Sequence, residues 1–311
     1  IAYHIGLMQR IVAFFAKLML KLMNVSGAEA LSNVASAFVG QVEAQIMIKP
    51  YLSTMTRSEL LASMAGSMAC IAGGVMAVYI SMGVPANLLL AASIMAAPAA
   101  LVISKIVLPE KEVSNTKGNV QLEVKKAHSG LMDAISHGAA DGLKISLNVI
   151  AMLIGVIALI ALVDFLLGKF GMLIVNVTDY GTFLGINLQQ LSLKEILGSI
   201  FSLFAWTMGV PTQDIHMAGQ LLGTKLAVNE FVAYSDLSAM IAAGALSPKT
   251  LTIVSIACCG FANFSSIAIQ VGGIGELAPS RRSELAKLGF TALICGTLAS
   301  YLSATIAGIL T

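Results

Sequence analysis

The stretch FVGQVEA, residues 38–44, places a carboxylate inside a segment that otherwise reads as membrane-buried. A second stretch, AVNEFVAY at residues 227–234, does the same. Glu43 and Glu230 each follow a helical arm of small residues that is too short to cross a bilayer. Because an ionisable group at membrane depth is costly, it is a functional-site hypothesis by default. The two glutamates therefore mark the candidate site.

Each glutamate is also followed by an apolar helix that is interrupted near its middle. The first interruption is AGGV at residues 72–75, and the second is GFANFSS at residues 260–266. Where a helix breaks inside a membrane, the freed backbone groups must line a cavity or be buried in protein. Paired interrupted segments at corresponding places in two halves point to the binding site of a secondary transporter. The pattern predicts that class.

Composition supports a membrane protein. The chain is 57% hydrophobic and 11% charged, with a mean hydropathy of +0.88, whereas a soluble domain carries about 25% charged residues. Uncharged windows of the length that a spanning helix needs are found at 60–104, 145–163, 250–275 and 288–311. The four cysteines lie in apolar segments without metal-ligand spacing, which indicates neither a disulfide framework nor a zinc site.

The sequence divides into two repeats. Residues 1–108 form the first repeat, 109–128 a polar linker, and 129–311 the second repeat. For the first repeat we expect an interfacial helix at 9–24, a re-entrant hairpin with arms at 27–40 and 42–55, and spans at 58–80 and 86–107. For the second we expect an interfacial segment at 129–142, a span at 143–167, an interfacial helix at 192–210, a hairpin at 211–240, and spans at 249–276 and 287–310.

The predicted spans also give an orientation. An odd number of spans separates the two hairpins, so the second repeat is inverted relative to the first. Lys and Arg gather on the side of the 109–128 linker, which the positive-inside rule places in the cytoplasm. The fold class is an all-α membrane protein with inverted repeats, two re-entrant hairpins and two interrupted transmembrane helices. Because Ile1 lies in what reads as the end of a helix, we expect further spans before it.

The side chains at these breaks suit a polar solute that has a flat ring and hydroxyl groups. Carboxylates and amides can bond hydroxyls and base edges, and an aromatic face can stack beside them. A buried glutamate could instead be a structural helix–helix bond, and Ser266 could bond back to its own helix. A channel, or a transporter of another polar solute, is the alternative function. An intramembrane enzyme is not expected, because the Gly-x-Ser-x-Gly and His-Glu-x-x-His motifs are absent from the sequence.

Five stretches resemble the concentrative nucleoside transporters, and the resemblance extends over essentially the whole chain. They are GQVEA at 40–44, IKPY at 48–51, MGVP at 208–211, TKLAVNEFVAY at 224–234 and GFANFSSIAI at 260–269. The resemblance implies a multi-pass homotrimer in the lipid bilayer of a bacterial inner (plasma) membrane. It implies an ion-coupled, elevator-type importer of nucleosides such as uridine, with no enzymatic activity and no nucleic-acid partner. Preference between purine and pyrimidine stays open.

The resemblance also implies which residues bind the substrate and the coupling ion. The substrate site would comprise Gly40, Gln41, Val42, Glu43, Val75, Glu230, Phe261, Asn263 and Ser266, with the first hairpin tip near the base and the second near the ribose. A sodium site would comprise Ser36, Cys70, Ile71 and Val75.

Three positions depart from the family pattern. Val42 replaces a hydroxyl residue, Ser36 replaces an Asn, and Cys70 offers a thiol, which is a poor ligand for a hard cation. Sodium coupling is therefore weakened, although backbone carbonyls at Ile71 and Val75 could still bind the ion. Proton coupling, or an altered sequence at these positions, are the alternatives.

Overall fold

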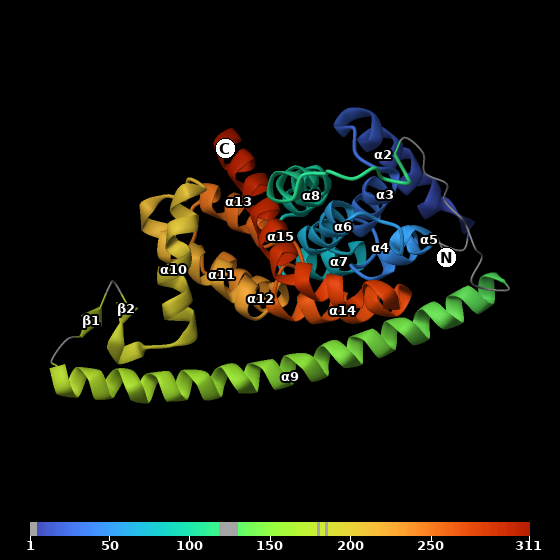
Figure 1. Ribbon diagram of the computed structural model, residues 1–311. Helices are drawn as coiled ribbons and strands as arrows, with labels where there is room; N and C mark the ends of the chain where they lie inside the picture. The colour runs from blue at the N-terminus through green and yellow to red at the C-terminus, as the bar shows by residue number, and fades with distance from the viewer. Residues whose placement is uncertain (1–4, 118–129, 179–180, 184–185) are drawn as a thin grey trace.

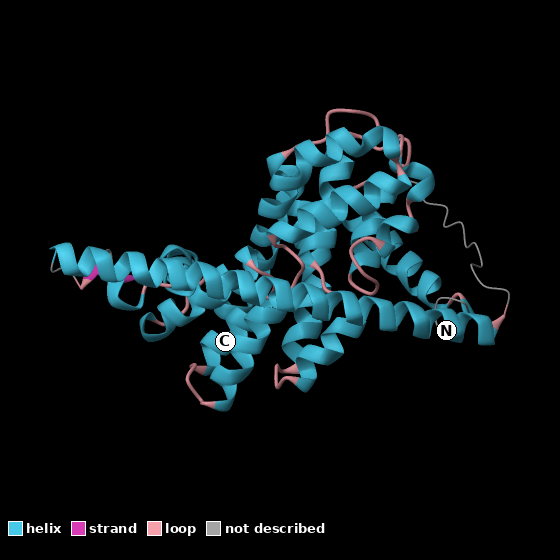
Figure 2. Ribbon diagram, turned by 90° about the horizontal axis from the view of Figure 1, so that it is seen from below, coloured by secondary structure: helices cyan, strands magenta, loops and turns pink. Residues whose placement is uncertain are grey.

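The computed structural model describes residues 5–117, 130–178, 181–183 and 186–311, and these are almost entirely helical (Figures 1 and 2). The first half contains α2 (Leu7–Met23), α3 (Gly27–Ser36), α4 (Glu43–Ile46), α5 (Lys49–Leu52), α6 (Arg57–Ala69), α7 (Gly73–Ser81) and α8 (Ala86–Val107). The second contains α9 (Leu131–Thr178), α10 (Leu193–Thr207), α11 (Ile215–Ala227), α12 (Glu230–Ala242), α13 (Pro248–Ala257), α14 (Phe264–Leu277) and α15 (Arg282–Leu310). Short 3-10 turns lie at η1 (Leu188–Gln190), η2 (Thr212–Asp214) and η3 (Pro279–Arg281).

The two halves present the same order of elements. In the first, α3 and α4–α5 form a hairpin, α6 and α7 an interrupted helix, and α8 a long helix. In the second, α11 and α12 form the hairpin, α13 and α14 the interrupted helix, and α15 the long helix. The all-α class is confirmed. The structure adds one short antiparallel ribbon, β1 (Thr182–Phe183) with β2 (Ile186–Asn187).

Capping side chains explain where several helices begin. Ser26 and Glu29 form a reciprocal capping box at the start of α3, and Thr56 and Glu59 form another at the start of α6. Such a box satisfies two backbone N–H groups that have no partner within the helix. At α13 the same end is capped by Ser247. The start of the linker reinforces α3, since Gly27 N donates to the Thr116 carbonyl at 2.9 Å.

Two predictions of segment boundaries are wrong. The second arm of the first hairpin is not one helix over 42–55, because α4 ends at Ile46 and α5 begins at Lys49. Pro50 accounts for the gap, since a proline ring clashes with the carbonyl four residues earlier, here that of Ile46. Residues beyond Lys117 in the 109–128 linker lie outside the described residues.

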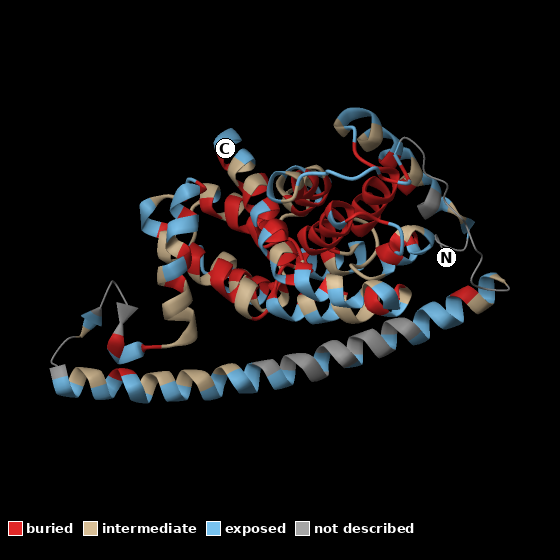
Figure 3. Cartoon of the chain, viewed as in Figure 1, coloured by how far each residue is buried: buried red, intermediate tan, exposed pale blue. Residues whose placement is uncertain are grey.

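The second wrong boundary concerns α9. The sequence predicts two segments, over 129–142 and 143–167, but α9 (Leu131–Thr178) is a single helix of 48 residues. It contains no proline, and backbone hydrogen bonding within a helix does not depend on whether the side chains meet water or lipid. In Figure 1 α9 runs along one side of the remaining helices, and Figure 3 shows that most of its described surface is exposed.

The buried core lies where the two halves pack together. Helix α15 packs against α8, α6, α13 and α14, and these contacts enclose the buried interior seen in Figure 3. Within the described residues, four segments are long and apolar enough to cross a membrane: Arg57–Ser81, Ala86–Val107, Ile157–Val177 and Pro279–Leu310. The first of them joins α6 and α7 across their interruption.

Candidate functional site

The Glu230 carboxylate is held by side chains from both halves. Its Oε1 accepts a hydrogen bond from the Tyr79 hydroxyl at 3.2 Å, and its Oε2 accepts one from Asn263 Nδ2, also at 3.2 Å. Glu230 is only 7% exposed and is the first residue of α12, where the helix dipole favours a negative charge. An ionised carboxylate has about four acceptor positions. Acceptor capacity therefore remains for the hydroxyl groups of a ligand.

Asparagine side chains cap the two helices that begin at this site. Asn229 Oδ1 accepts from Val232 N at 2.9 Å, and Asn263 Oδ1 accepts from Ser266 N at 3.0 Å. Since Asn263 Oδ1 also accepts from the Ser265 hydroxyl at 2.6 Å, its oxygen is fully used. The Asn263 amide nitrogen is thereby directed at Glu230, so that this residue joins the second interruption to the second hairpin.

Backbone hydrogen bonds join the remaining breaks. Gly73 N donates to the Phe38 carbonyl at 3.3 Å, which connects the first interruption to the tip of the first hairpin. Phe261 N donates to the Cys70 carbonyl at 3.3 Å, which connects the two interruptions. Together with the Tyr79–Glu230 bond, these contacts link both hairpins and both interrupted helices into one body.

The tip of the first hairpin packs on the second half. Val42 fills the space beside Gly273 of α14, where an added Cβ would lie 2.6 Å from the Val42 side chain. The Glu43 carboxylate folds over Gly40 so closely that a Cβ added there would collide with Glu43 Oε2. Glu43 is exposed in the single chain, unlike Glu230. Gln41 Oε1 is buried without a hydrogen-bond partner in the described part of the chain, and such a group is costly until a donor reaches it.

The hydroxyl of Ser266 is occupied within the protein. It donates to the Phe261 carbonyl and lies 3.1 Å from Asn263 Oδ1. From the sequence, Ser266 could either contact the substrate or bond to the protein next to it, and the structure shows the second. The Phe261 side chain is half-buried beside it.

The side chains suggested for a cation offer few free oxygen atoms. The Ser36 hydroxyl donates to the Ser32 carbonyl at 2.8 Å and lies 2.9 Å from Ser67 Oγ, within a buried polar network that also holds Gln45. Cys70 carries a thiol, and its carbonyl already accepts from Phe261 N. Side chains at this place therefore fit a hard cation poorly, because such ions prefer oxygen ligands. Ile71 is fully buried and Val75 is half-buried, so only their backbone carbonyls could contribute.

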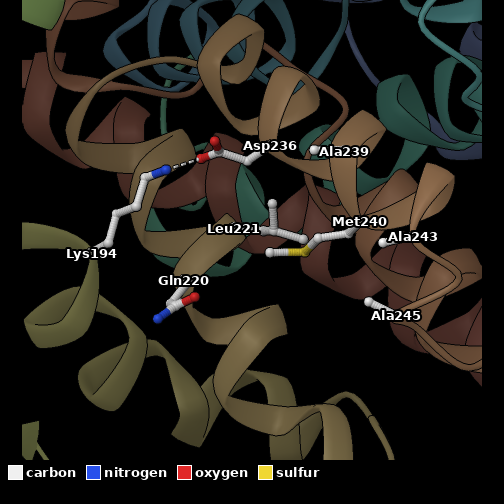
Figure 4. A pocket seen from close by; sticks show the side chains of 8 residues that line it. All are labelled: Lys194, Gln220, Leu221, Asp236, Ala239, Met240, Ala243 and Ala245. Carbon is white, nitrogen blue, oxygen red and sulfur yellow. Dashed lines mark ion pairs between the residues drawn. The ribbon is translucent and has the colours of Figure 1, made fainter.

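Two cavities border the second hairpin. One, of about 220 Å³, lies between α9 and the hairpin tip and is lined by Leu159, Ile160, Val163, Leu193, Ala227, Val228, Asn229 and Ser265. The other, of about 300 Å³, lies between α10, α11 and α12, and Figure 4 shows its lining residues. Lys194 and Asp236 form an ion pair of 2.7 Å at its rim. The first cavity adjoins the Glu230 site through Asn229.

Sequence reasoning missed two residues here. Tyr79 is separated from Glu230 by 151 positions, and no local signal connects them. Lys225 is fully buried five positions before Glu230. A lysine in an apolar helical arm is an intramembrane charge in the same sense as the glutamates, so the same argument could have found it.

Comparisons with known proteins identify the family of the chain. The profile of the family described as "Na+ dependent nucleoside transporter C-terminus" matches residues 88–308, and one described as "Nucleoside recognition" matches residues 1–86. The uncharacterized transporter YutK of Bacillus subtilis is 44% identical over 309 residues, which is 99% of this chain and 73% of YutK. CNTnw in an inward-facing substrate-bound state is 40% identical with a TM-score of 0.91, covering 100% of this chain and 71% of that one.

A CNTnw variant in an outward-facing state gives a TM-score of 0.89 at 40% identity, over 100% of this chain and 70% of that one. Fold, site and matches together define a membrane transporter. The chain belongs to the Na⁺-dependent nucleoside transporter family. The activity of this family is transport rather than enzymatic catalysis.

Proposed function

We propose that this protein imports nucleosides such as uridine across a bacterial inner membrane, driven by a gradient of sodium ions or protons. The observation that carries the proposal is the buried Glu230 carboxylate, which Tyr79 and Asn263 hold from two different elements while acceptor capacity remains. A polar group of this kind, buried at a helix break, suits the recognition of a solute rather than the stability of the fold.

The proposed contacts follow from donors and acceptors. Glu230 would accept hydrogen bonds from ribose hydroxyls. The side-chain oxygen of Gln41, which is buried and has no hydrogen-bond partner among the described residues, would accept one from the edge of the base. Phe261 would supply an apolar surface. A site with buried polar groups rejects analogues that leave those groups unpaired, which gives strong specificity.

For the transport step we propose an elevator-type movement. The hairpins and the interrupted helices form one linked body, which would move as a unit. Helix α9 would belong to the scaffold. Helix α10 would move with the second hairpin, because the Lys194–Asp236 ion pair and the bonds of Glu195 to His216 and Gln220 join it to α11 and α12. The hydrogen bond from Leu193 N to Asp164 Oδ1, at 2.7 Å, would then break during the movement. The cavity between α9 and the second hairpin is lined mostly by apolar side chains, so sliding there breaks few polar contacts. The inward-facing and outward-facing states of CNTnw support alternating access.

The scaffold is also where we place contacts with lipid and with further copies in a homotrimer. The segment Ile157–Val177 of α9 is only 6% buried within the single chain. Outside the scaffold, apolar side chains also remain exposed on α10, among them Leu203 and Trp206. A surface of this kind must face acyl chains or another protein, because exposed apolar patches of that extent are rare in water.

Uptake of radiolabelled uridine into proteoliposomes tests the proposal, with sodium and pH gradients imposed separately. We expect saturable uptake that a cation gradient drives, and near-complete loss of uptake in Glu230→Gln, since bonds to a charged group contribute about 1.5–3 kcal/mol each. A matched control is Glu195→Gln, because Glu195 lies on α10 and bonds to His216 and Gln220 outside the site. Gradient-independent conductance would instead support the channel, and normal uridine affinity in Glu230→Gln would remove Glu230 from the site.

A further inference from the structure

Lys225 is a fully buried lysine whose ammonium is unpaired within the described part of the chain. It lies on α11, and Nζ has neither a hydrogen bond nor an ion pair with any residue that the structure describes. A charge removed from water is retained only where an opposite charge or a polar network compensates it. The position of Lys225, five residues before the Glu230 carboxylate, shows where that compensation would come from.

The buried carboxylate nearest to Lys225 along the second hairpin is that of Glu230. Lys225 lies in the last turn of α11, close to the hairpin tip from which Glu230 begins α12, whereas the buried carboxylate of Asp214 lies at the opposite end of α11. The separation from Glu230 exceeds the 4.0 Å limit of a direct ion pair. At such a distance in a water-poor interior the attraction between opposite charges is still substantial, because the effective dielectric constant is low.

The internal repeat places Lys225 beside the counterpart of the candidate cation site. Glu43 and Glu230 are 187 residues apart, and so are Gly73 and Gly260 at the two interruptions. With this spacing, the four positions suggested for a cation in the first half correspond to Gly223, Ala257, Cys258 and Ala262. None of these residues has a side-chain oxygen, so their side chains cannot hold a free hard cation.

We infer that Lys225 is a tethered cation, which supplies in the second half the positive charge that a free ion would supply in the first. The positive charge of its ammonium, in the last turn of α11, compensates the negative charge of Glu230. Tyr79 and Asn263 donate hydrogen bonds to the same carboxylate. Lys225 is thus a positioning residue that keeps Glu230 ionised and able to accept hydroxyl groups. The inference rests on the proposed nucleoside site at Glu230.

A double-mutant cycle tests the charge balance without any substrate. The melting temperature is measured in detergent for the wild type, Lys225→Met, Glu230→Gln and the double variant. Each single variant leaves one buried charge uncompensated, and we expect it to melt about 5–10 °C lower. The double variant should recover at least half of the loss that Lys225→Met causes. The control Lys111→Met makes the same charge change on the surface and should melt like the wild type.

The inference would be overturned if the double variant lost as much melting temperature as the two single variants lose together. If Lys225→Met cannot be purified, a double variant that folds supports the inference, and one that also fails to fold contradicts it. Lys225→Arg retains the charge and should stay within a few degrees of the wild type. An equal loss in Lys225→Arg and Lys225→Met would show that side-chain shape, rather than charge, is what matters.

A pH comparison separates charge balance from packing. The difference in melting temperature between the wild type and Lys225→Met should narrow in acid, because protonation removes the uncompensated charge of Glu230 in the variant. The other ionisable side chains buried here, the thiols of Cys258 and Cys259 and the phenols of Tyr79 and Tyr234, are of types that in water titrate only above neutral pH. The difference between the wild type and the control Lys111→Met should not change with pH, and an unchanged difference for Lys225→Met would refute the inference.

Calorimetry of uridine binding to the wild type then distinguishes the two proposals. Coupling in the cycle without uridine binding would refute the nucleoside site and leave the charge pair standing. Uridine binding with additive losses would refute the tethered cation alone.

Discussion

Replacing Tyr79 by phenylalanine removes one atom from the site and little else. The hydroxyl donates to Glu230 Oε1 at 3.2 Å, and the ring packs on Tyr234 with centroids 4.2 Å apart. In Tyr79→Phe the ring keeps those contacts and the buried position, so the fold should be retained. One carboxylate oxygen then loses its donor, and Glu230 must be ordered by the ligand at the moment of binding.

The expected loss of uridine affinity in Tyr79→Phe follows from the length of the Tyr79–Glu230 hydrogen bond. A hydrogen bond to a charged group contributes about 1.5–3 kcal/mol. At 3.2 Å this bond is longer than the usual hydroxyl–oxygen distance, so the lower end, about 1.5 kcal/mol, is appropriate. Since about 1.4 kcal/mol corresponds to a factor of ten, uridine affinity should fall roughly tenfold.

The assay is calorimetric binding of uridine to purified protein, with Tyr234→Phe as the matched control. Tyr234 loses the same atom, but its hydroxyl donates to the Ser255 carbonyl at 2.7 Å rather than to Glu230. We expect Tyr234→Phe to lower the melting temperature and to leave affinity within about threefold. If both variants weaken binding equally, or if Tyr79→Phe has wild-type affinity, the hydrogen bond to Glu230 does not prepare the site.

Three further predictions concern the ligand, the coupling ion and the base of the second hairpin. Uridine analogues without the 3′-hydroxyl should compete poorly for uptake, because Glu230 and Asn263 would stay buried without a partner; equal competition would show that the sugar is not recognised here. Uridine affinity at low and high sodium, at fixed ionic strength, should depend weakly on sodium in the wild type and more steeply in Ser36→Asn, which adds an amide oxygen. A strong, saturable dependence that the substitution does not increase would show that backbone carbonyls suffice. At Asp214, which precedes α11, burial works to raise the pKa, but hydrogen bonds from Ser247 and Thr250 prevail and lower it. This carboxylate therefore stabilises the fold above its unfolded pKa, and that contribution is lost as pH falls through the lowered folded pKa. Asp214→Asn should lower the melting temperature at neutral pH, and its difference from the wild type should narrow in acid; a constant difference would exclude the charge as the cause.

The sequence by itself determined the elements on which the site is built. Glu43 and Glu230 could be singled out because membrane burial of a charge is penalised wherever the chain goes. The interruptions at Gly73 and Gly260 could be predicted because glycine-rich breaks in apolar segments are local features of the chain. The all-α fold and the order of the helices follow from such local patterns, and the structure confirms them. The re-entrant course of the hairpins in the membrane and the division into two repeats stay predictions.

Only the tertiary structure decided which side chains meet. Tyr79 reaches Glu230 because α7 packs against the second hairpin, and neither hydropathy nor helix propensity specifies a contact across 151 positions. The continuity of α9 was missed for the opposite reason, since a change in polarity along a chain does not interrupt a helix whose backbone bonds are unbroken. Ser36 and Lys225 show the same limit. Their types are visible in the sequence, but whether a hydroxyl is already bonded, or an ammonium lacks a partner, depends on packing between helices that are distant in the chain.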